Sequence, residues 1–200
     1  MRKTLLICAS LLLFYSQCPA ARLPATSEPL LIVSVPDQKL VIVHDGALLA
    51  EYPVSTSRFG IGDGIGSYAT PLGALEVANK IGAQAPTGEV FKGRRPTGEI
   101  VHPNASGRDA ILSRILCLRG LESANRHAFE RGIYIHGTPV ERLIGRPASY
   151  GCIRMRSCDI IQLFNTVGIG ARVQIVNIPL KRAITCSTGS RPDFPDSTGA

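Results

Sequence analysis

The sequence predicts a mainly β domain with one short helix. Of its 200 residues, 20 are Gly and 14 are Pro, and this frequency indicates many turns. Short runs of β-branched residues alternate with turn residues, and helical spacing is convincing in one segment only. Hydrophobic residues make up 44% of the chain and charged residues 18%, a composition that excludes wholesale disorder, a coiled coil and a collagen-like repeat.

The N-terminal segment, residues 1–20, has the pattern of a secretory signal peptide. Arg2 and Lys3 precede an apolar run from Leu5 to Tyr15, and small residues lead up to Ala20. The run is shorter than the ~20 residues that a membrane-spanning helix needs. We therefore expect export with cleavage near Ala20, to the periplasm or cell envelope. An uncleaved anchor and a lipid-modified Cys18 are the alternatives.

The first strands follow a polar linker at residues 21–29. Two β-branched runs, 30–35 and 39–44, are separated by a Pro-Asp-Gln turn, and Asp45-Gly46 leads into a third run at 47–54. These runs predict a three-stranded meander. Polar and apolar residues alternate only weakly in the second run, so we expect its strand to be buried on both faces.

The next segment, residues 55–73, is a glycine-rich connection. Its glycines do not follow the spacing of a dinucleotide-binding loop, because the third glycine of that pattern is missing. Residues 72–78 predict a strand, and residues 81–98 predict a long loop.

The second half of the chain contains further strands and the helix. Strands are predicted at 110–118, 132–136 and 171–178. The helix is predicted at 157–167, with Ser157 as its N-cap and apolar residues at helical spacing. We expect the catalytic domain to span residues 30–180 and residues 181–200 to form a flexible tail.

Cys152 and His136 are the residues that point to chemistry. His136 ends a predicted strand, and Cys152 precedes the predicted helix. A thiolate nucleophile needs a base or a positive potential to lower its pKa from about 8.5. His136 could be the base, and Arg154 with the helix N-terminus could supply the potential. The N–H groups of Gly151 and Cys152 could stabilise an oxyanion. The alternatives are a structural histidine and a small buried cysteine.

Residues 135–138 together with 149–155 resemble the signature of the L,D-transpeptidase family, whose catalytic domain is of the YkuD type. The resemblance extends to the Thr-Pro-Leu-Gly turn at 70–73 and to the segments 91–99 and 111–116. It covers about residues 30–178.

The resemblance implies a β-sandwich-like enzyme that cuts peptidoglycan stem tetrapeptides after the diamino acid. Cys152 would attack that carbonyl, D-alanine would leave, and an amine of another stem, a wall-attached lipoprotein or water would resolve the acyl-enzyme. His136 would take the thiol proton. Arg154 would anchor a substrate carboxylate or form a structural ion pair. Further oxyanion and substrate-binding positions would be Ser149, Tyr150, Gly151, Gly137 and Thr138.

Tyr150 departs from the family pattern, because most members carry a histidine at this position. A phenol with a pKa of about 10 cannot replace an imidazole as a base near neutral pH. We therefore expect Tyr150 to serve in hydrogen bonding or packing, with His136 as the base.

The remaining features define the alternatives. Cys117 is expected in the core and Cys186 in the tail, and Cys158 is a structural or free thiol or a redox partner of Cys152. Neither a metal site, a cofactor nor a nucleic-acid partner is expected, and the protein is expected to be a monomer. A papain-like protease is disfavoured because such enzymes place Cys before His. The competing functions are a carboxypeptidase or endopeptidase with water as acceptor, and a noncatalytic wall-binding module.

Overall fold

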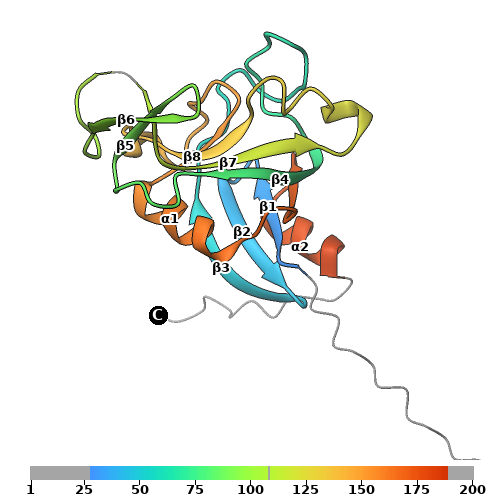
Figure 1. Ribbon diagram of the computed structural model, residues 1–200. Coiled ribbons are helices and arrows are strands. Elements are labelled where there is room, and N and C mark those ends of the chain that lie inside the picture. Colours follow the sequence, from blue (N-terminus) through green and yellow to red (C-terminus); the bar gives the residue numbers. More distant parts are fainter. Residues whose placement is uncertain (1–27, 108, 189–200) are drawn as a thin grey trace, which may run out of the picture.

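Ten strands and two helices make up the described part of the chain, residues 28–107 and 109–188 of a computed structural model (Figure 1). The strands are β1 Leu30–Ser34, β2 Lys39–His44, β3 Ala47–Pro53, β4 Gly73–Ile81, β5 Glu89–Lys92, β6 Arg95–Ile100, β7 Ile111–Gly120, β8 Tyr134–Gly137, β9 Ile153–Met155 and β10 Arg172–Val176. The helices are α1 Ser157–Thr166 and α2 Leu180–Thr188, and two short 3-10 turns cover Ser123–Asn125 and Glu141–Leu143. The predicted mainly β fold is confirmed.

The strands form one curved sheet in the order β3-β2-β1-β10-β4-β7-β5-β6, and β8 and β9 extend it from β7. The meander β1–β3 is antiparallel as predicted, whereas β10 pairs with β1 in parallel. The meander runs at a steep angle to β4 and β7, so the sheet encloses a core between its two parts (Figure 1). Buried side chains of α1 complete this core, namely Ile160, Leu163 and Phe164.

The strand β2 is buried on both faces, as its weak alternation predicts. Leu40 and Ile42 lie in the main core, and Val41 and Val43 face a second, smaller cluster. Such a strand needs a cover on its outer face, because exposed apolar area is costly in water.

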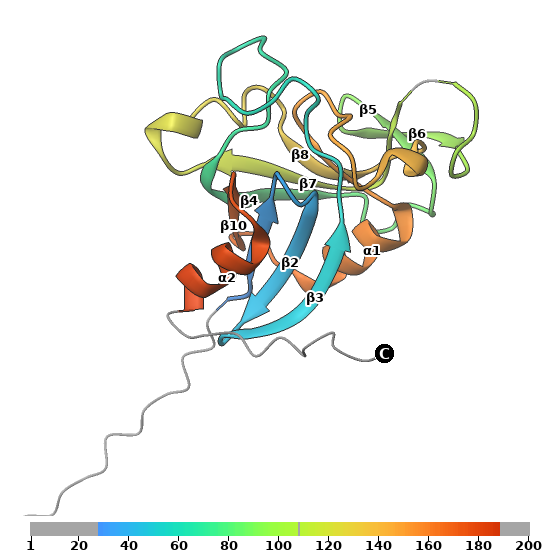
Figure 2. The ribbon, with the colours of Figure 1, turned by 180° about the vertical axis from the view of Figure 1, so that it is seen from behind.

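The cover is α2, and the expected flexible tail from residue 181 is therefore wrong as far as Thr188. Leu180, Ala183 and Ile184 are buried against the outer face of β1 and β2 (Figure 2). Their i, i+3, i+4 spacing is that of one helix face. The fold thus has a second helix, and the domain extends to Thr188. The predicted signal peptide, residues 21–27 of the linker and residues 189–200 lie outside the described residues.

Strands β5 and β6 form a hairpin where a long loop was expected, and that expectation is wrong. Gly93 and Arg94, at the turn, have φ of +58° and +65°, as the commonest two-residue hairpin turn requires. Every residue of β6 is exposed, so no apolar pattern indicates this strand. The carboxylate of Glu89 instead holds β6 in place, because its Oε1 accepts hydrogen bonds from the N–H groups of Thr97 and Gly98 at 2.8 and 2.7 Å.

The predicted helix after Cys152 is confirmed as α1, but its cap differs. Arg156 occupies the N-cap position and makes no side-chain capping bond. The Ser157 N–H is instead satisfied by Glu141, whose Oε1 accepts it at 2.8 Å. Within the described ranges, no helix is long and apolar enough to cross a membrane.

The packing of α2 generates a stability prediction. Ile184 is 3% exposed, so Ile184→Ala should lower the free energy of unfolding by about 2–3 kcal/mol through lost burial and the cavity left behind. Urea denaturation measures this. Cys186→Ser, at an exposed position of the same helix, should change the free energy by less than about 0.5 kcal/mol. Equal effects of the two substitutions would show that α2 does not dock.

Candidate active site

The two sequence motifs meet in one pocket because β8 pairs with β9 in parallel. The register sets Ile135 opposite Ile153 and His136 opposite Arg154. A pocket of about 210 Å³ lies at this junction, and its lining is Asp109, Ile111, His136, Tyr150, Cys152 and Arg154. Four of these six residues were predicted as site residues from the sequence.

His136 is 5% exposed and neutral at pH 7. Burial lowers its pKa to about 4, against the opposing effect of its hydrogen bond to Gly137. The ring Nδ1 lies 2.7 Å from the Gly137 carbonyl oxygen. A carbonyl only accepts, so Nδ1 carries the proton in this bond and Nε2 keeps the basic lone pair. The imidazole can therefore take a proton at Nε2.

Cys152 holds a protonated thiol, and the expectation of a lowered pKa is wrong. Burial raises the pKa of the thiol to about 11, and this effect outweighs the Tyr134 N–H and the nearby charge of Arg154, which favour the thiolate. The Sγ atom donates to the Gly132 carbonyl at 3.3 Å and accepts the Tyr134 N–H at 3.4 Å. The resting site is thus a neutral thiol beside a neutral imidazole.

Arg154 forms the ion pair that was one of its two predicted roles. Its side chain is 6% exposed and pairs with the carboxylate of Asp109. Thr138 holds the other oxygen of that carboxylate, with its hydroxyl donating at 2.8 Å. Asp109 was missed by sequence reasoning, because it lies in a polar loop before β7 with no motif around it. In the described structure the guanidinium is therefore already charge-compensated.

The cysteine loop is fixed by short hydrogen bonds from its neighbours. The Ser149 hydroxyl donates to the Cys152 carbonyl at 2.6 Å and accepts the Gly151 N–H at 3.2 Å. The Gly151 N–H is therefore engaged, so the Cys152 N–H is the candidate oxyanion donor of the predicted pair. The Thr70 hydroxyl, in the Thr-Pro-Leu-Gly turn, donates to the Gly151 carbonyl at 3.0 Å.

Glycine is required at position 151 by its surroundings. Its φ is +115°, and a Cβ atom there would lie 3.2 Å from the Ala69 carbonyl oxygen. Gly137 is similarly constrained, since a Cβ would come within 2.6 Å of the Leu112 carbonyl oxygen. Both glycines, with Thr138 behind Asp109, therefore support the pocket structurally.

Tyr150 lines the pocket with half of its side chain exposed. Its hydroxyl oxygen accepts a hydrogen bond from Arg58 Nη2 at 2.7 Å. The ring centroid lies 5.5 Å from that of Phe59 and 6.0 Å from that of Tyr68. Hydrogen bonding and packing thus account for the residue at this position.

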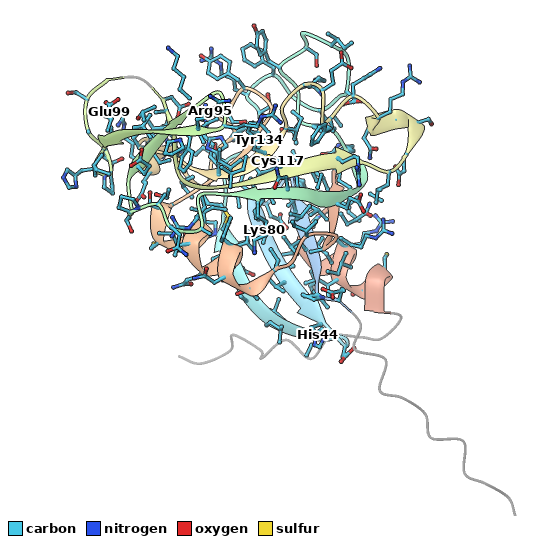
Figure 3. The ribbon with its side chains drawn as sticks, viewed as in Figure 1. His44, Lys80, Arg95, Glu99, Cys117 and Tyr134 are labelled. Carbon is cyan, nitrogen blue, oxygen red and sulfur yellow. The ribbon has the colours of Figure 1, made fainter. Side chains whose placement is uncertain are left out.

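The four cysteines of the described ranges are all free thiols. Cys117 is fully buried in β7, opposite Tyr134 of β8, as expected for a core residue (Figure 3). Cys158 is exposed and donates to Asp159 at 3.3 Å, so it forms no disulfide with Cys152. Cys186 is exposed on α2.

Fold and site together define a mainly β domain with a cysteine–histidine pocket. The family model of the L,D-transpeptidase catalytic domain, YkuD, matches residues 28–175, and the chain belongs to this family. A putative L,D-transpeptidase of Bacillus subtilis, YqjB, is 25% identical over 86% of this chain and 84% of its own length.

Other relatives match over shorter segments. The probable L,D-transpeptidase ErfK/SrfK of Escherichia coli is 51% identical over 47 residues, which are 24% of this chain and 15% of that protein. This chain therefore matches only a small part of that relative's length. Among solved structures, an L,D-transpeptidase from Mycobacterium smegmatis has a TM-score of 0.48 and 18% identity, over 74% of this chain and 58% of its own.

The neutral thiol generates a prediction for alkylation. In a chain that starts at Ala21 and carries Cys117→Ala, Cys158→Ser and Cys186→Ser, Cys152 is the remaining thiol. Its iodoacetamide rate should rise about tenfold per pH unit from pH 7 to 10, because thiolate is scarce below a pKa of about 11. In urea, the alkylation rate of the same protein should instead level off above a pKa of about 8.5. A folded profile that levels below pH 9 would contradict the neutral thiol.

Buried His136 generates a prediction for stability against pH. The unfolded chain binds a proton on this ring below a pKa of about 6.5, whereas the folded protein binds it only near 4. The contribution of neutral His136 to the free energy of unfolding is therefore fully present above pH 6.5. It is lost as the pH falls, by about 3 kcal/mol at pH 4. Urea titrations of the wild type and His136→Gln should diverge by this amount between pH 7 and 4. Parallel curves would show that the ring has the same pKa in the folded and the unfolded protein, and would contradict the lowered pKa.

Proposed function

We propose that this chain is an exported L,D-transpeptidase that acts on peptidoglycan stem peptides through an acyl-enzyme on Cys152. The observation that carries the proposal is the parallel pairing of β8 and β9, which brings His136 and Cys152 into one pocket. Membership of the L,D-transpeptidase family supports the reaction type. Export rests on the sequence pattern of residues 1–20 alone.

The acylation step follows from the protonation states. The Cys152 thiol attacks the carbonyl after the diamino acid while its proton passes to His136 Nε2. The oxygen of the tetrahedral intermediate gains negative charge, which the Cys152 N–H stabilises. The C–N bond then breaks, the imidazolium returns the proton to the leaving D-alanine amine, and a thioester remains on Sγ.

The deacylation step uses the same imidazole. An acceptor amine attacks the thioester carbonyl, His136 takes its excess proton, and the C–S bond breaks to restore the thiol as that proton returns to sulfur. The acceptor is an amine of another stem peptide or of a wall-attached lipoprotein. Water in the same position would make the protein a carboxypeptidase or endopeptidase.

The central prediction concerns the nucleophile. Cys152→Ala should abolish D-alanine release from a disaccharide tetrapeptide, because no thioester can form. Mass spectrometry of products, with and without a second amine, checks this and identifies the acceptor. Cys117→Ala, a second buried thiol outside the pocket, should retain turnover. Wild-type release by Cys152→Ala would refute the mechanism, and release of D-alanine with no amide product would select the hydrolytic alternative.

A further prediction concerns Tyr150. Tyr150→Phe removes the hydroxyl that Arg58 binds and should slow turnover only about fivefold, the effect of one ordinary hydrogen bond of about 1 kcal/mol. Tyr150→His should be tolerated, because His136 supplies the base. Steady-state rates on the tetrapeptide measure both variants. A loss of about a thousandfold in Tyr150→Phe would mean that the hydroxyl takes part in the chemistry.

A further inference from the structure

Three aromatic side chains form an exposed cluster beside the cysteine pocket. Phe59, Tyr68 and Tyr150 are 48%, 56% and 50% exposed, and their ring centroids are 5.5 to 6.0 Å apart. The chain contains only six Phe, five Tyr and no Trp. An exposed apolar patch of this kind marks an interaction surface, because water contact with several adjoining rings is unfavourable.

The cluster is held in place by its surroundings. The Ser57 hydroxyl donates to the Tyr68 carbonyl at 2.6 Å, and Arg131 Nη2 donates to the Ala69 carbonyl at 2.6 Å. Tyr68 has a φ of +56°, a left-handed conformation that is strained for a bulky residue, so the surrounding structure must hold it in place. The guanidinium of Arg58 lies 4.9 Å from the Phe59 ring centroid and 4.5 Å from that of Tyr150. The rings are thus presented to solvent by a fixed loop.

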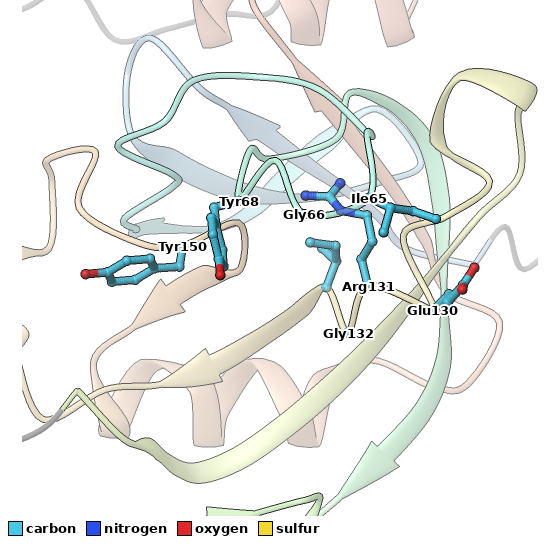
Figure 4. Close-up of a pocket in the computed structure, with 8 residues that line it drawn as sticks. Ile65, Gly66, Tyr68, Glu130, Arg131, Gly132 and Tyr150 are labelled. Atoms are coloured by element: carbon cyan, nitrogen blue, oxygen red, sulfur yellow. The ribbon is translucent and has the colours of Figure 1, made fainter.

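A second pocket, of about 280 Å³, adjoins the cluster (Figure 4). Tyr68 and Tyr150 stand on one side of it, and the segment from Glu130 to Gly132 lies on the other. Tyr150 also lines the cysteine pocket, and the Gly132 carbonyl oxygen accepts a hydrogen bond from the Cys152 thiol. A molecule in the second pocket therefore lies against the residues that surround Cys152, so one extended substrate can occupy both pockets.

We propose that the aromatic cluster and the second pocket bind N-acetylhexosamine rings of the glycan strand that carries the stem peptide, an inference that rests on the proposed function. A pyranose ring has a face of C–H groups, which pack on the electron-rich face of an aromatic ring. It also has a rim of hydroxyl and acetamido groups, for which the Tyr68 hydroxyl and the Glu130 carboxylate offer partners. Aromatic rings bordered by hydroxyl, carboxylate and guanidinium groups, all of which can hydrogen-bond sugar hydroxyls, thus match a sugar chain.

The test measures, by NMR titration, the binding of a β-1,4-linked N-acetylglucosamine tetramer to the Cys152→Ala protein. Phe59→Ala and Tyr68→Ala should each weaken binding about five- to tenfold, by removing one stacking surface. Phe129→Ala is the matched control, because Phe129 is 43% exposed and lies outside the cluster. It should leave binding unchanged. Because all three rings are exposed, the variants should keep the unfolding transition of the parent protein.

The proposal is overturned if the tetramer does not bind saturably, or if Phe59→Ala and Phe129→Ala bind it equally well. It is also overturned if the cluster variants lose binding to anionic lipid vesicles while tetramer binding stays unchanged.

A kinetic arm separates this inference from the proposed function. With Cys152 intact, Phe59→Ala should lower kcat/KM for a disaccharide tetrapeptide about five- to tenfold and leave kcat/KM for the free tetrapeptide unchanged. An equal loss on both donors would contradict sugar binding. If the wild type turned over neither donor while the tetramer still bound through the cluster, the proposed function would fail and the sugar site would stand.

Discussion

The parallel hydrogen bonding of β8 to β9 is the interaction on which the candidate site depends. It joins the two motifs, residues 135–138 and 149–155, and its register sets His136 opposite Arg154 with Cys152 directly before β9. On its other side β8 pairs with β7, and Gly137 permits the close approach of these two strands because it has no Cβ. A side chain at position 137 would therefore disturb the core and the pocket together.

Burial determines the chemistry of this pocket. It raises the pKa of Cys152 and lowers that of His136, so neither group is charged in the resting protein. The only full charges among the pocket residues belong to Arg154 and Asp109, which neutralise each other. A thiol in this state is protected from oxidation and alkylation. Charge separation then occurs only as the thiol proton moves to the imidazole during attack on a bound carbonyl.

The elements of the fold that could be predicted from the sequence are those whose signals lie within a short stretch of the chain. The meander β1–β3 and helix α1 follow from β-branched runs, an Asp-Gly turn and one helical repeat. The exposed strand β6 was missed because it buries nothing, and α2 because its apolar face is short and set in a polar segment. His136 and Cys152 were found through their motifs. Asp109 was not, because its role depends on tertiary contacts with Thr138 and Arg154 rather than on spacing.

The most direct test of a nucleophilic Cys152 is peptide mapping of the trapped acyl-enzyme. The wild-type protein is incubated with a disaccharide tetrapeptide, quenched in acid to preserve thioesters, digested and analysed by mass spectrometry. The predicted result is an adduct of the donor minus D-alanine on the peptide that contains Cys152. An adduct on the peptide of Cys158 or Cys186, or release of D-alanine with no covalent adduct even at the earliest quench times, would contradict this account.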